Sequence, residues 1–272
     1  MRASSAATRE AGRKVLKDGV PSAWQQMQDV ASDLFSVADL VKQNPGLARA
    51  LTDPARSAED KVALAKDVFS EKTHPLAQAI LNELVSGRFS SENDLSHALE
   101  DIASDGQFYW AASEGKLEQV AQELFNVTQL LQKERELRNV LSDSSESRAS
   151  RRAQLVQTLF AHAVSPQALT LLQRASAYPR EGSLLATLRR YAQRASQLRD
   201  RKLVTVEAPQ ELEPAQLERL HNILRNRYGR DVDLNVSIVP SLIGGLRIHT
   251  SSHITDGTVR NALARTRERL AG

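Results

Sequence analysis

The sequence predicts a mainly α-helical protein with a small α+β unit at its C-terminal end: tandem helical bundles followed by a β-α-β-β-α domain. Three observations predict this fold class. Only 4% of the 272 residues are aromatic, while alanine, leucine, arginine and glutamate are common, which favours helices over packed sheets. Apolar residues recur at three- and four-residue steps through the first two-thirds of the chain. Strict alternation of apolar and polar residues occurs later, over residues 232–238.

The first helical bundle is expected within residues 1–110. One apolar stripe at helical spacing is made by Met27, Val30, Leu34, Val37 and Leu40. A boundary follows at Pro54 and Ser57, where the helical pattern stops and restarts. His74 and Pro75 interrupt the next helix, because proline cannot continue one. The unit is therefore predicted to contain several short helices rather than one long one.

The pattern of this first bundle recurs along the chain. At an offset of 90 residues the positions pair as Met27/Leu117, Val30/Val120, Leu34/Leu124, Phe35/Phe125, Val37/Val127, Leu40/Leu130, Leu47/Leu137, Leu51/Leu141 and Asp53/Asp143. At an offset of 91 they pair as Leu64/Leu155, Phe69/Phe160, Pro75/Pro166, Ala77/Ala168, Ile80/Leu171 and Leu81/Leu172. Any two amphipathic helices can be slid into register, but here aspartate and proline align as well, so we favour a duplication. It predicts a second bundle at residues 111–201, joined to the first near residues 91–113.

A unit of another kind is predicted over residues 202–272. Leu203, Val204 and Val206 indicate a short strand, and Pro214 suits the first turn of a helix that ends at Gly229. A half-buried strand is then indicated by the alternating residues Val232, Leu234, Val236 and Ile238. The apolar run at residues 240–248 predicts a second strand, and residues 257–270 predict the last helix.

Bulk properties exclude several kinds of chemistry. Because cysteine is absent, the chain forms no disulfide and offers no thiolate ligand or cysteine nucleophile. No apolar run reaches the roughly 18 residues that a membrane-spanning helix needs, and residues 1–5 lack the apolar core of a secretion signal. A net charge of +3 is a weak argument for a nucleic-acid partner. We therefore expect any link to a membrane to go through a partner protein.

The residues that could carry catalysis or hold a ligand form no convincing site. His249, His253 and Asp256 are the nearest approach to a metal site, but no third histidine is close in sequence, so we favour a solvent-facing turn. No serine, histidine and acid form a legible triad. Gly244 and Gly245 lack the lysine and hydroxyl residue of a phosphate loop, and we interpret them as packing devices that let a helix approach closely.

The last predicted helix begins with an Asp-Gly turn. The carboxylate of Asp256 is expected to accept the backbone N–H of Thr258 or Val259 and to interact favourably with the positive end of the helix. One side of the helix is apolar and carries Val259, Ala262, Leu263 and Leu270. The other sides carry Arg260, Arg265, Arg267 and Arg269. These arginines form either a solvated face or a grip for an acidic partner helix, and we favour the solvated face.

A basic stretch spans residues 180–202 and supports an alternative function. Its cations are Arg180, Arg189, Arg190, Arg194, Arg199, Arg201 and Lys202, opposed by only Glu181 and Asp200. Nucleic acid favours such a stretch. Tyr178 and Tyr191 are the only aromatic residues there, however, which is too few for a surface that stacks bases. Because the charge supports nucleic-acid binding and the scarcity of aromatic residues does not, a helical nucleic-acid-binding protein is the second hypothesis.

The C-terminal motifs carry a family resemblance. Ser241-Leu242-Ile243-Gly244-Gly245, followed by Asp256-Gly257-Thr258-Val259-Arg260, resembles the C-terminal signature of the δ subunits of F-type ATP synthases, the family of the oligomycin-sensitivity-conferring protein. The resemblance covers residues 202–272, and the first 100 or so residues are compatible with the six-helix bundle of that family. By this resemblance the residues assigned to partner binding are Ser241, Gly244, Gly245, Asp256, Gly257, Val259, Arg260 and Leu263.

The resemblance implies a structural role. It implies a non-catalytic stator subunit of the peripheral stalk, at the cytoplasmic face of the bacterial plasma membrane, without catalytic residues, cofactor, metal or nucleic acid. The implied partners are the N-terminal helices of the α subunits on the catalytic head and the b subunits of the stalk. This chain is longer than the common form by roughly the second helical repeat, so it resembles a long form of δ. Which bundle contacts the catalytic head is left open.

Overall fold

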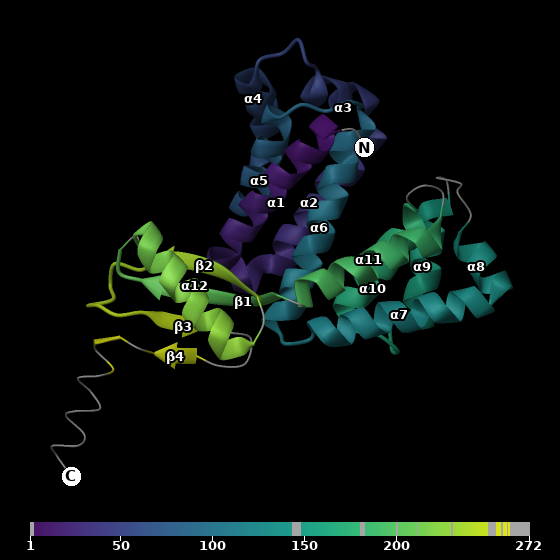
Figure 1. Ribbon diagram of the computed structural model, residues 1–272. Helices are drawn as coiled ribbons and strands as arrows, with labels where there is room; N and C mark the ends of the chain where they lie inside the picture. Colours follow the sequence, from purple (N-terminus) through teal and green to yellow (C-terminus); the bar gives the residue numbers. More distant parts are fainter. Residues whose placement is uncertain are drawn as a thin grey trace.

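A computed structural model describes residues 3–142, 148–179, 183–199, 201–210, 212–229, 231–249, 254–256, 258–259 and 261. Helices make up most of these residues, and a small sheet lies near the C-terminal end (Figure 1). The α-helices are α1 (Ala3–Ala23), α2 (Met27–Gln43), α3 (Pro45–Thr52), α4 (Ala58–Phe69), α5 (Pro75–Ser86), α6 (Asn93–Ser113), α7 (Leu117–Lys133), α8 (Arg135–Leu141), α9 (Ala149–Phe160), α10 (Pro166–Ala177), α11 (Leu184–Arg199) and α12 (Pro214–Tyr228). The strands are β1 (Arg201–Ala208), β2 (Asp231–Ile238), β3 (Arg247–His249) and β4 (Ile254–Asp256). A mainly helical chain with a small sheet is thereby confirmed.

The predicted repeat is visible in the helix boundaries. Helices α6 and α7 begin and end 90 residues after α1 and α2, and α9 and α10 begin and end 91 residues after α4 and α5. The same helix pairs are also in contact: α4 packs on α5 as α9 packs on α10, and α2 packs on α6 as α7 packs on α11. Helix α6 therefore occupies the last position of the first repeat and the first position of the second.

Equivalent residues of the two repeats make equivalent polar contacts. In the first repeat the carboxylate of Asp33 accepts the backbone N–H of His74 at 2.6 Å. In the second, the carboxylate of Glu123 accepts the backbone N–H of Ser165 at 2.9 Å. His74 and Ser165 each precede the proline that begins a helix. Because N–H groups at a helix start have no partner within the helix, an acid on the neighbouring helix satisfies one of them in both repeats.

A buried cation closes the end of a helix in each repeat. Lys61 on α4 donates to the carbonyl of Gly87 at 3.3 Å, just beyond α5. Arg152 on α9, its equivalent at an offset of 91, donates to the carbonyls of Ser176 and Ala177 at 2.7 and 2.8 Å. Carbonyls at the C-terminal end of a helix carry partial negative charge and favour cations. The duplication therefore preserved the contacts that satisfy the backbone.

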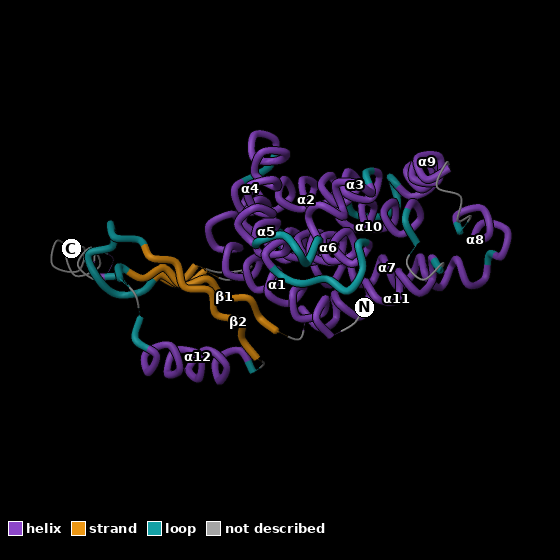
Figure 2. Tube along the Cα trace, turned by 90° about the horizontal axis from the view of Figure 1, so that it is seen from above, coloured by secondary structure: helices purple, strands orange, loops and turns teal. Residues whose placement is uncertain are grey.

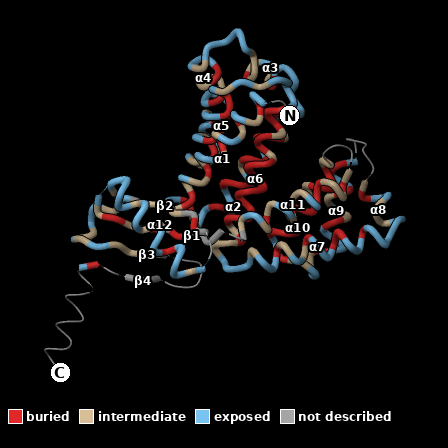
Figure 3. The backbone as a smooth tube through the Cα atoms, viewed as in Figure 1, coloured by how far each residue is buried: buried red, intermediate tan, exposed pale blue. Residues whose placement is uncertain are grey.

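Helix α6 is buried on all sides because both repeats pack against it. Leu95, Leu99 and Ile102 belong to the core of the first repeat, whereas Phe108 and Ala111 belong to the core of the second. Figure 3 shows α6 as an almost continuous buried segment. The joining stretch predicted near residues 91–113 is thus a structural helix of both cores rather than a linker.

Two carboxylates on α6 connect three helices. Asp105, with a side chain only 1% exposed, lies 2.8 Å from Nε of Arg13 on α1 and 2.7 Å from Nε of Arg194 on α11. Asp101 lies 2.9 Å from a guanidinium nitrogen of Arg9 on α1 and 3.5 Å from one of Arg190 on α11. Buried carboxylates require such partners. The acids of α6 therefore fasten helices from both repeats to one another.

A second contact on another side of α6 involves Arg174 of α10. Its guanidinium donates to both carboxylate oxygens of Asp39 on α2, at 2.7 and 2.8 Å, and also to Glu100 on α6. It lies 4.6 Å from the ring centroids of Phe35 and Tyr178. Burial by itself lowers the pKa of Arg174, but the hydrogen bonds and charges of Asp39 and Glu100 outweigh it and raise that pKa.

The sheet has the strand order β2-β1-β3-β4. Strands β1 and β2 are parallel, with Val206 opposite Val236, and β3 and β4 continue the sheet in antiparallel pairs. Helix α12 packs beside it and contributes Leu224 to a core that also contains Val204, Val206 and Val232. Figure 2 shows the sheet and α12 projecting to one side of the helices. Strand β2 also contacts α1, so the sheet rests on the first repeat.

The strand predicted at residues 240–248 is wrong for most of its length. Of residues 240–248 only Arg247 and Ile248 are in a strand, namely β3, and residues 239–246 form a loop. Pro240 has no N–H to donate to a neighbouring strand. Gly244 and Gly245 have φ angles of 149° and 80°, which an extended strand does not use. Within the described residues no helix is long and apolar enough to cross a membrane.

We predict that Asp105→Ala destabilises both repeats together. Removing this carboxylate leaves Arg13 and Arg194 without their shared partner, which costs about 3 kcal/mol of unfolding free energy. Urea denaturation followed by circular dichroism should show a single transition at lower urea concentration. The matched control is Arg49→Ala, which removes an exposed pair with Glu92 and should change the free energy by about 0.5 kcal/mol or less. An equal effect of the two variants would contradict the prediction.

Alkaline pH should destabilise the chain through Tyr191 on α11. Burial, reinforced by the charge of Glu100, raises the pKa of Tyr191 to about 12. In the unfolded chain the tyrosine phenol ionises at its ordinary pKa of about 10. The stability contributed by the neutral phenol is therefore complete below pH 10 and is lost as the pH rises towards 12. The loss amounts to about 2–3 kcal/mol. Tyr191→Phe should remove this part of the pH dependence in urea denaturation, and an unchanged pH profile would contradict the assignment.

Candidate partner-binding site

The loop at residues 239–246 positions the predicted partner-binding residues. The N–H of Val239 donates to the carbonyl of Ala208 at 2.7 Å, which fixes the loop to the end of β1. The N–H of Leu242 donates to the carbonyl of Val239 at 3.0 Å and closes a turn that exposes Ser241. After this turn Gly244 and Gly245 reverse the backbone into β3 with positive φ angles that favour glycine.

Gly244 and Val259 are in direct contact. The carbonyl of Gly244 accepts the backbone N–H of Val259 at 3.0 Å. A Cβ atom added to Gly244 would lie 3.2 Å from Cγ2 of Val259, closer than most such contacts. The structure thus brings together two predicted residues that are separated in sequence, and Gly244 allows the close approach that its position in the apolar run suggested.

Apolar side chains around this loop face solvent. Ile243 is 70% exposed, and Ile238 and Val259 are exposed as well. Isolated exposed apolar residues are ordinary, but three that border one loop form a candidate contact surface. The sequence analysis did not assign Ile243 to partner binding. A sign of this role was nevertheless present in the sequence, because Ile243 is a large aliphatic residue next to glycines that prevent a regular strand.

The predicted last helix, residues 257–270, lies almost entirely outside the residues that the structure describes, so its capping by Asp256 stays a prediction. Asp256 ends β4 opposite Arg247, and the hydroxyl of the buried Thr258 accepts the N–H of Asn261 at 3.3 Å. That hydroxyl occupies the place of an N-cap, which threonine favours. The side chain of Asp256, and the predicted residues Gly257, Arg260 and Leu263, lie outside the residues that the structure describes.

Part of the basic stretch at residues 180–202 is directed into the protein. Arg190 and Arg194 pair with the buried carboxylates of α6, and Tyr191 is itself buried against Phe108 in an edge-to-face contact with ring centroids 6.4 Å apart. Arg189 is exposed, and the side chains of the remaining cations lie outside the described part. An interface for nucleic acid needs exposed cations and rings, so these contacts weaken that hypothesis.

No metal or catalytic arrangement emerges in the described part of the chain. It contains no group of three histidine, cysteine or acidic side chains that could hold a metal ion. His249 lies in β3 opposite Ile254, and His253 lies outside the described residues.

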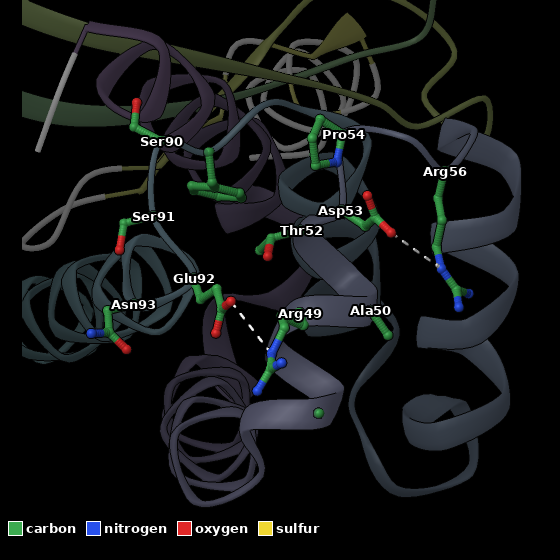
Figure 4. Close-up of a pocket in the computed structure, with 12 residues that line it drawn as sticks. Arg49, Ala50, Thr52, Asp53, Pro54, Arg56, Ser90, Ser91, Glu92 and Asn93 are labelled. Atoms are coloured by element: carbon green, nitrogen blue, oxygen red, sulfur yellow. Dashed lines mark ion pairs between the residues drawn. The ribbon is translucent and has the colours of Figure 1, made fainter.

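A polar cleft opens at the end of the first repeat that lies away from the sheet (Figure 1). It lies between α3 and the segment that leads into α6 (Figure 4). Its volume is about 990 Å³. Its charged side chains pair with one another: Arg49 lies 3.4 Å from Glu92, and Arg56 lies 4.0 Å from Asp53. Ser90 and Ser91 add hydroxyl groups. The cleft is therefore lined mainly by polar side chains whose charges are already paired.

Comparison with known proteins gives the family. The sequence profile of the family described as "ATP synthase delta (OSCP) subunit" matches residues 21–107 and again residues 104–270. The chain belongs to this family. The two matches meet within α6, which agrees with the helix being shared by two repeats, and the predicted resemblance to a long, duplicated δ subunit is confirmed.

Proteins named ATP synthase subunit delta resemble the chain over nearly its whole length. The one from Beutenbergia cavernae is 35% identical over 272 residues, covering 100% of both chains. That of Thermobifida fusca is 33% identical and that of Renibacterium salmoninarum 34% identical, each over 94% of both chains. Family membership makes the chain a non-catalytic peripheral-stalk subunit of ATP synthase, and the comparisons give no support to nucleic-acid binding.

We predict that Gly244→Ala loosens the contact between the loop and Val259. The added Cβ meets Cγ2 of Val259 and strains the backbone at a positive φ, which costs on the order of 1 kcal/mol. The amide hydrogen of Val259 should therefore exchange faster by NMR. Gly229→Ala is the matched control, because it also places a side chain at a positive φ of 66° but meets nothing within 4 Å. Equal exchange at Val259 in both variants would contradict the role of Gly244.

Proposed function

We propose that this subunit joins the α subunits on the catalytic head of F-type ATP synthase to the b subunits of the peripheral stalk. The observation that carries the proposal is the δ-family match through both repeats and the sheet unit. Proton flow turns the central rotor, and the head would turn with it unless it were held. On this proposal the subunit holds the catalytic head against rotation at the cytoplasmic face of the bacterial plasma membrane. It binds neither cofactor nor metal.

The proposed division of labour uses three units: residues 1–110, residues 111–201 and residues 202–272. Helix α6 crosses the boundary between the first two and contributes to both cores, and the ion pairs of Asp101, Asp105 and Arg174 tie them together. A torque-bearing part must not yield at its joints. Buried, hydrogen-bonded ion pairs lose much of their stabilisation when their geometry changes, which supports a stiff connection.

We assign binding of the b subunits to the loop of the sheet unit, with Ser241, Gly244, Gly245, Asp256, Gly257, Val259, Arg260 and Leu263 forming or shaping the surface. Exposed Ile243 is the apolar anchor of this surface. The N-terminal helices of the α subunits are assigned to the helical repeats, because an amphipathic helix binds a bundle through apolar anchors at three- and four-residue spacing.

The test of this function is reconstitution. Membranes stripped of the native δ subunit should regain ATP synthesis driven by proton flow when the purified chain is added. The chain alone should hydrolyse no ATP, and pull-down in high salt should recover α, β and b subunits. Two results would overturn the proposal. One is a pull-down that recovers nucleic acid at low salt and loses it at high salt. The other is ATP hydrolysis that copurifies with the chain.

Ile243→Asp should weaken binding to the b subunits. A carboxylate cannot be buried in an apolar contact without a partner, so we expect roughly tenfold or greater loss of affinity by surface plasmon resonance. Leu130→Asp, which changes another exposed apolar residue on α7 of the second repeat, is the matched control and should leave this affinity unchanged. Unchanged affinity of Ile243→Asp would exclude the loop as the contact.

A further inference from the structure

A small cavity lies where α1, α6 and α11 meet, at the boundary between the two repeats. Its volume is about 220 Å³, several times the ~30 Å³ that one water molecule occupies in the liquid. Gln193 and Gln197 of its lining are exposed, which gives a solute access from the solvent. The cavity is therefore large enough for a small ion with its water, but too small for a segment of another protein.

Arginines outnumber acids in the lining of this cavity. Each of the three helices contributes two charged residues four positions apart, and residues at this spacing lie on one face of a helix. The pairs are Arg9 and Arg13 on α1, Asp101 and Asp105 on α6, and Arg190 and Arg194 on α11. Glu10 also pairs with Arg13, at 3.3 Å, but its side chain is mostly exposed to solvent. The described lining therefore holds four guanidinium groups and two carboxylates, an excess of positive charge that attracts anions.

The N–H donors of these arginines also outnumber the acceptors that the carboxylates offer. A guanidinium has five N–H groups, so four have roughly 20, whereas two carboxylates have roughly eight acceptor positions. Arg194 uses Nε and one terminal nitrogen for Asp105, at 2.7 and 3.0 Å. Arg9 uses one terminal nitrogen for Asp101, at 2.9 Å. Among the described residues, the other terminal nitrogen of each of these two arginines makes no hydrogen bond and can bind a further acceptor.

Two buried donors of α1 lack an acceptor in the described part of the chain. One is Nε of Arg9. The other is Nε of Arg13, which lies 2.8 Å from the carboxylate of Asp105 without the geometry of a hydrogen bond. A buried donor that stays unpaired costs free energy, so each such group in a folded protein needs an explanation. An anion with several oxygen atoms in the cavity would supply the acceptors.

The groups present favour an oxyanion of the phosphate class over other ligands. Guanidinium groups are planar and bind two oxygens of a phosphate through parallel N–H groups. A metal cation would be repelled by the arginines, and Asp105 already accepts from Arg194 and pairs with Arg13. Phe108 and Tyr191 meet edge to face in the lining rather than forming a platform on which a base could stack.

We propose that the cavity binds a small multivalent oxyanion of the phosphate class between the guanidinium groups of α1 and α11. Arg9 and Arg13 contact it from the first repeat, and Arg190 and Arg194 contact it from the second. The ion therefore adds a link between the repeats beside the carboxylates of α6. The proposal concerns a solute and does not depend on where the α and b subunits bind.

Isothermal titration calorimetry of the full-length chain with inorganic phosphate tests the proposal. The ionic strength is kept constant with sodium chloride, so that general screening by salt is the same throughout. We expect saturable binding of one phosphate per chain, and sulfate should compete for the same site. Phosphate should also raise the midpoint of thermal unfolding, because it binds the folded chain and not the unfolded one.

Arg190→Gln should weaken phosphate binding roughly tenfold or more, because it removes one of the guanidinium groups. The fold should survive this change, since Arg190 is partly exposed and lies 3.5 Å from Asp101, which keeps its pair with Arg9. Arg189→Gln is the matched control, because it makes the same change at the neighbouring, exposed residue and should leave binding unchanged. Arg9→Gln removes a guanidinium from the opposite helix and should weaken binding to a similar extent. Circular dichroism establishes that each variant keeps its helices.

Two further ligands separate a free ion from a phosphate group that belongs to a larger molecule. ATP and vesicles of phosphatidylglycerol both carry phosphate, but neither fits as a whole into a cavity of this size. Each should therefore bind more weakly than inorganic phosphate. Absence of saturable phosphate binding, equal affinity of Arg190→Gln, Arg9→Gln and Arg189→Gln, or tighter binding of ATP or of the vesicles would overturn the proposal.

Discussion

The carboxylates of α6 are the constraint on which the helical part depends. Asp101 and Asp105 are buried between arginines from α1 on one side and α11 on the other, so neither repeat can separate from α6 without leaving buried charges unpaired. Arg174 adds a third link from α10 to α2 and α6. Because one helix serves two cores, the two repeats share buried contacts that resist their separation. This is the mechanical property that a stator subunit needs.

The two repeats have equivalent interiors and unequal surfaces. Lys61 and Arg152 close the ends of equivalent helices, since a carbonyl left bare at a helix end is costly wherever it is buried. On the surface no such requirement applies. Phe35 is buried beneath Arg174 of the second repeat, whereas its equivalent Phe125 is half exposed because no further repeat follows to cover it. The faces of the two repeats have therefore diverged more than their interiors.

The C-terminal loop combines rigidity with exposure. Its hydrogen bonds to β1 and to Val259 fix the backbone, so Ile243 is held in solvent without being free to fold back onto the core. An apolar side chain presented in this way loses little conformational entropy on binding, because the backbone that carries it is already ordered. The sheet unit that carries this loop is joined to the helical repeats through β1 and the contact of β2 with α1.

The sequence by itself determined the helical class, the repeat at offsets of 90 and 91, the helix from Pro214 to Gly229 and the family, because periodicity, proline and glycine act locally and persist under any packing. It misassigned residues 240–246 as strand, since an apolar run does not reveal positive φ angles. Only the tertiary structure decided that α6 belongs to both repeats, that Arg190 and Arg194 point inward, and that Ile243 faces solvent. The first two of these properties depend on contacts between residues some 90 positions apart in the chain, such as Arg194 with Asp105, and the exposure of Ile243 depends on the fold of its loop, neither of which a local pattern encodes.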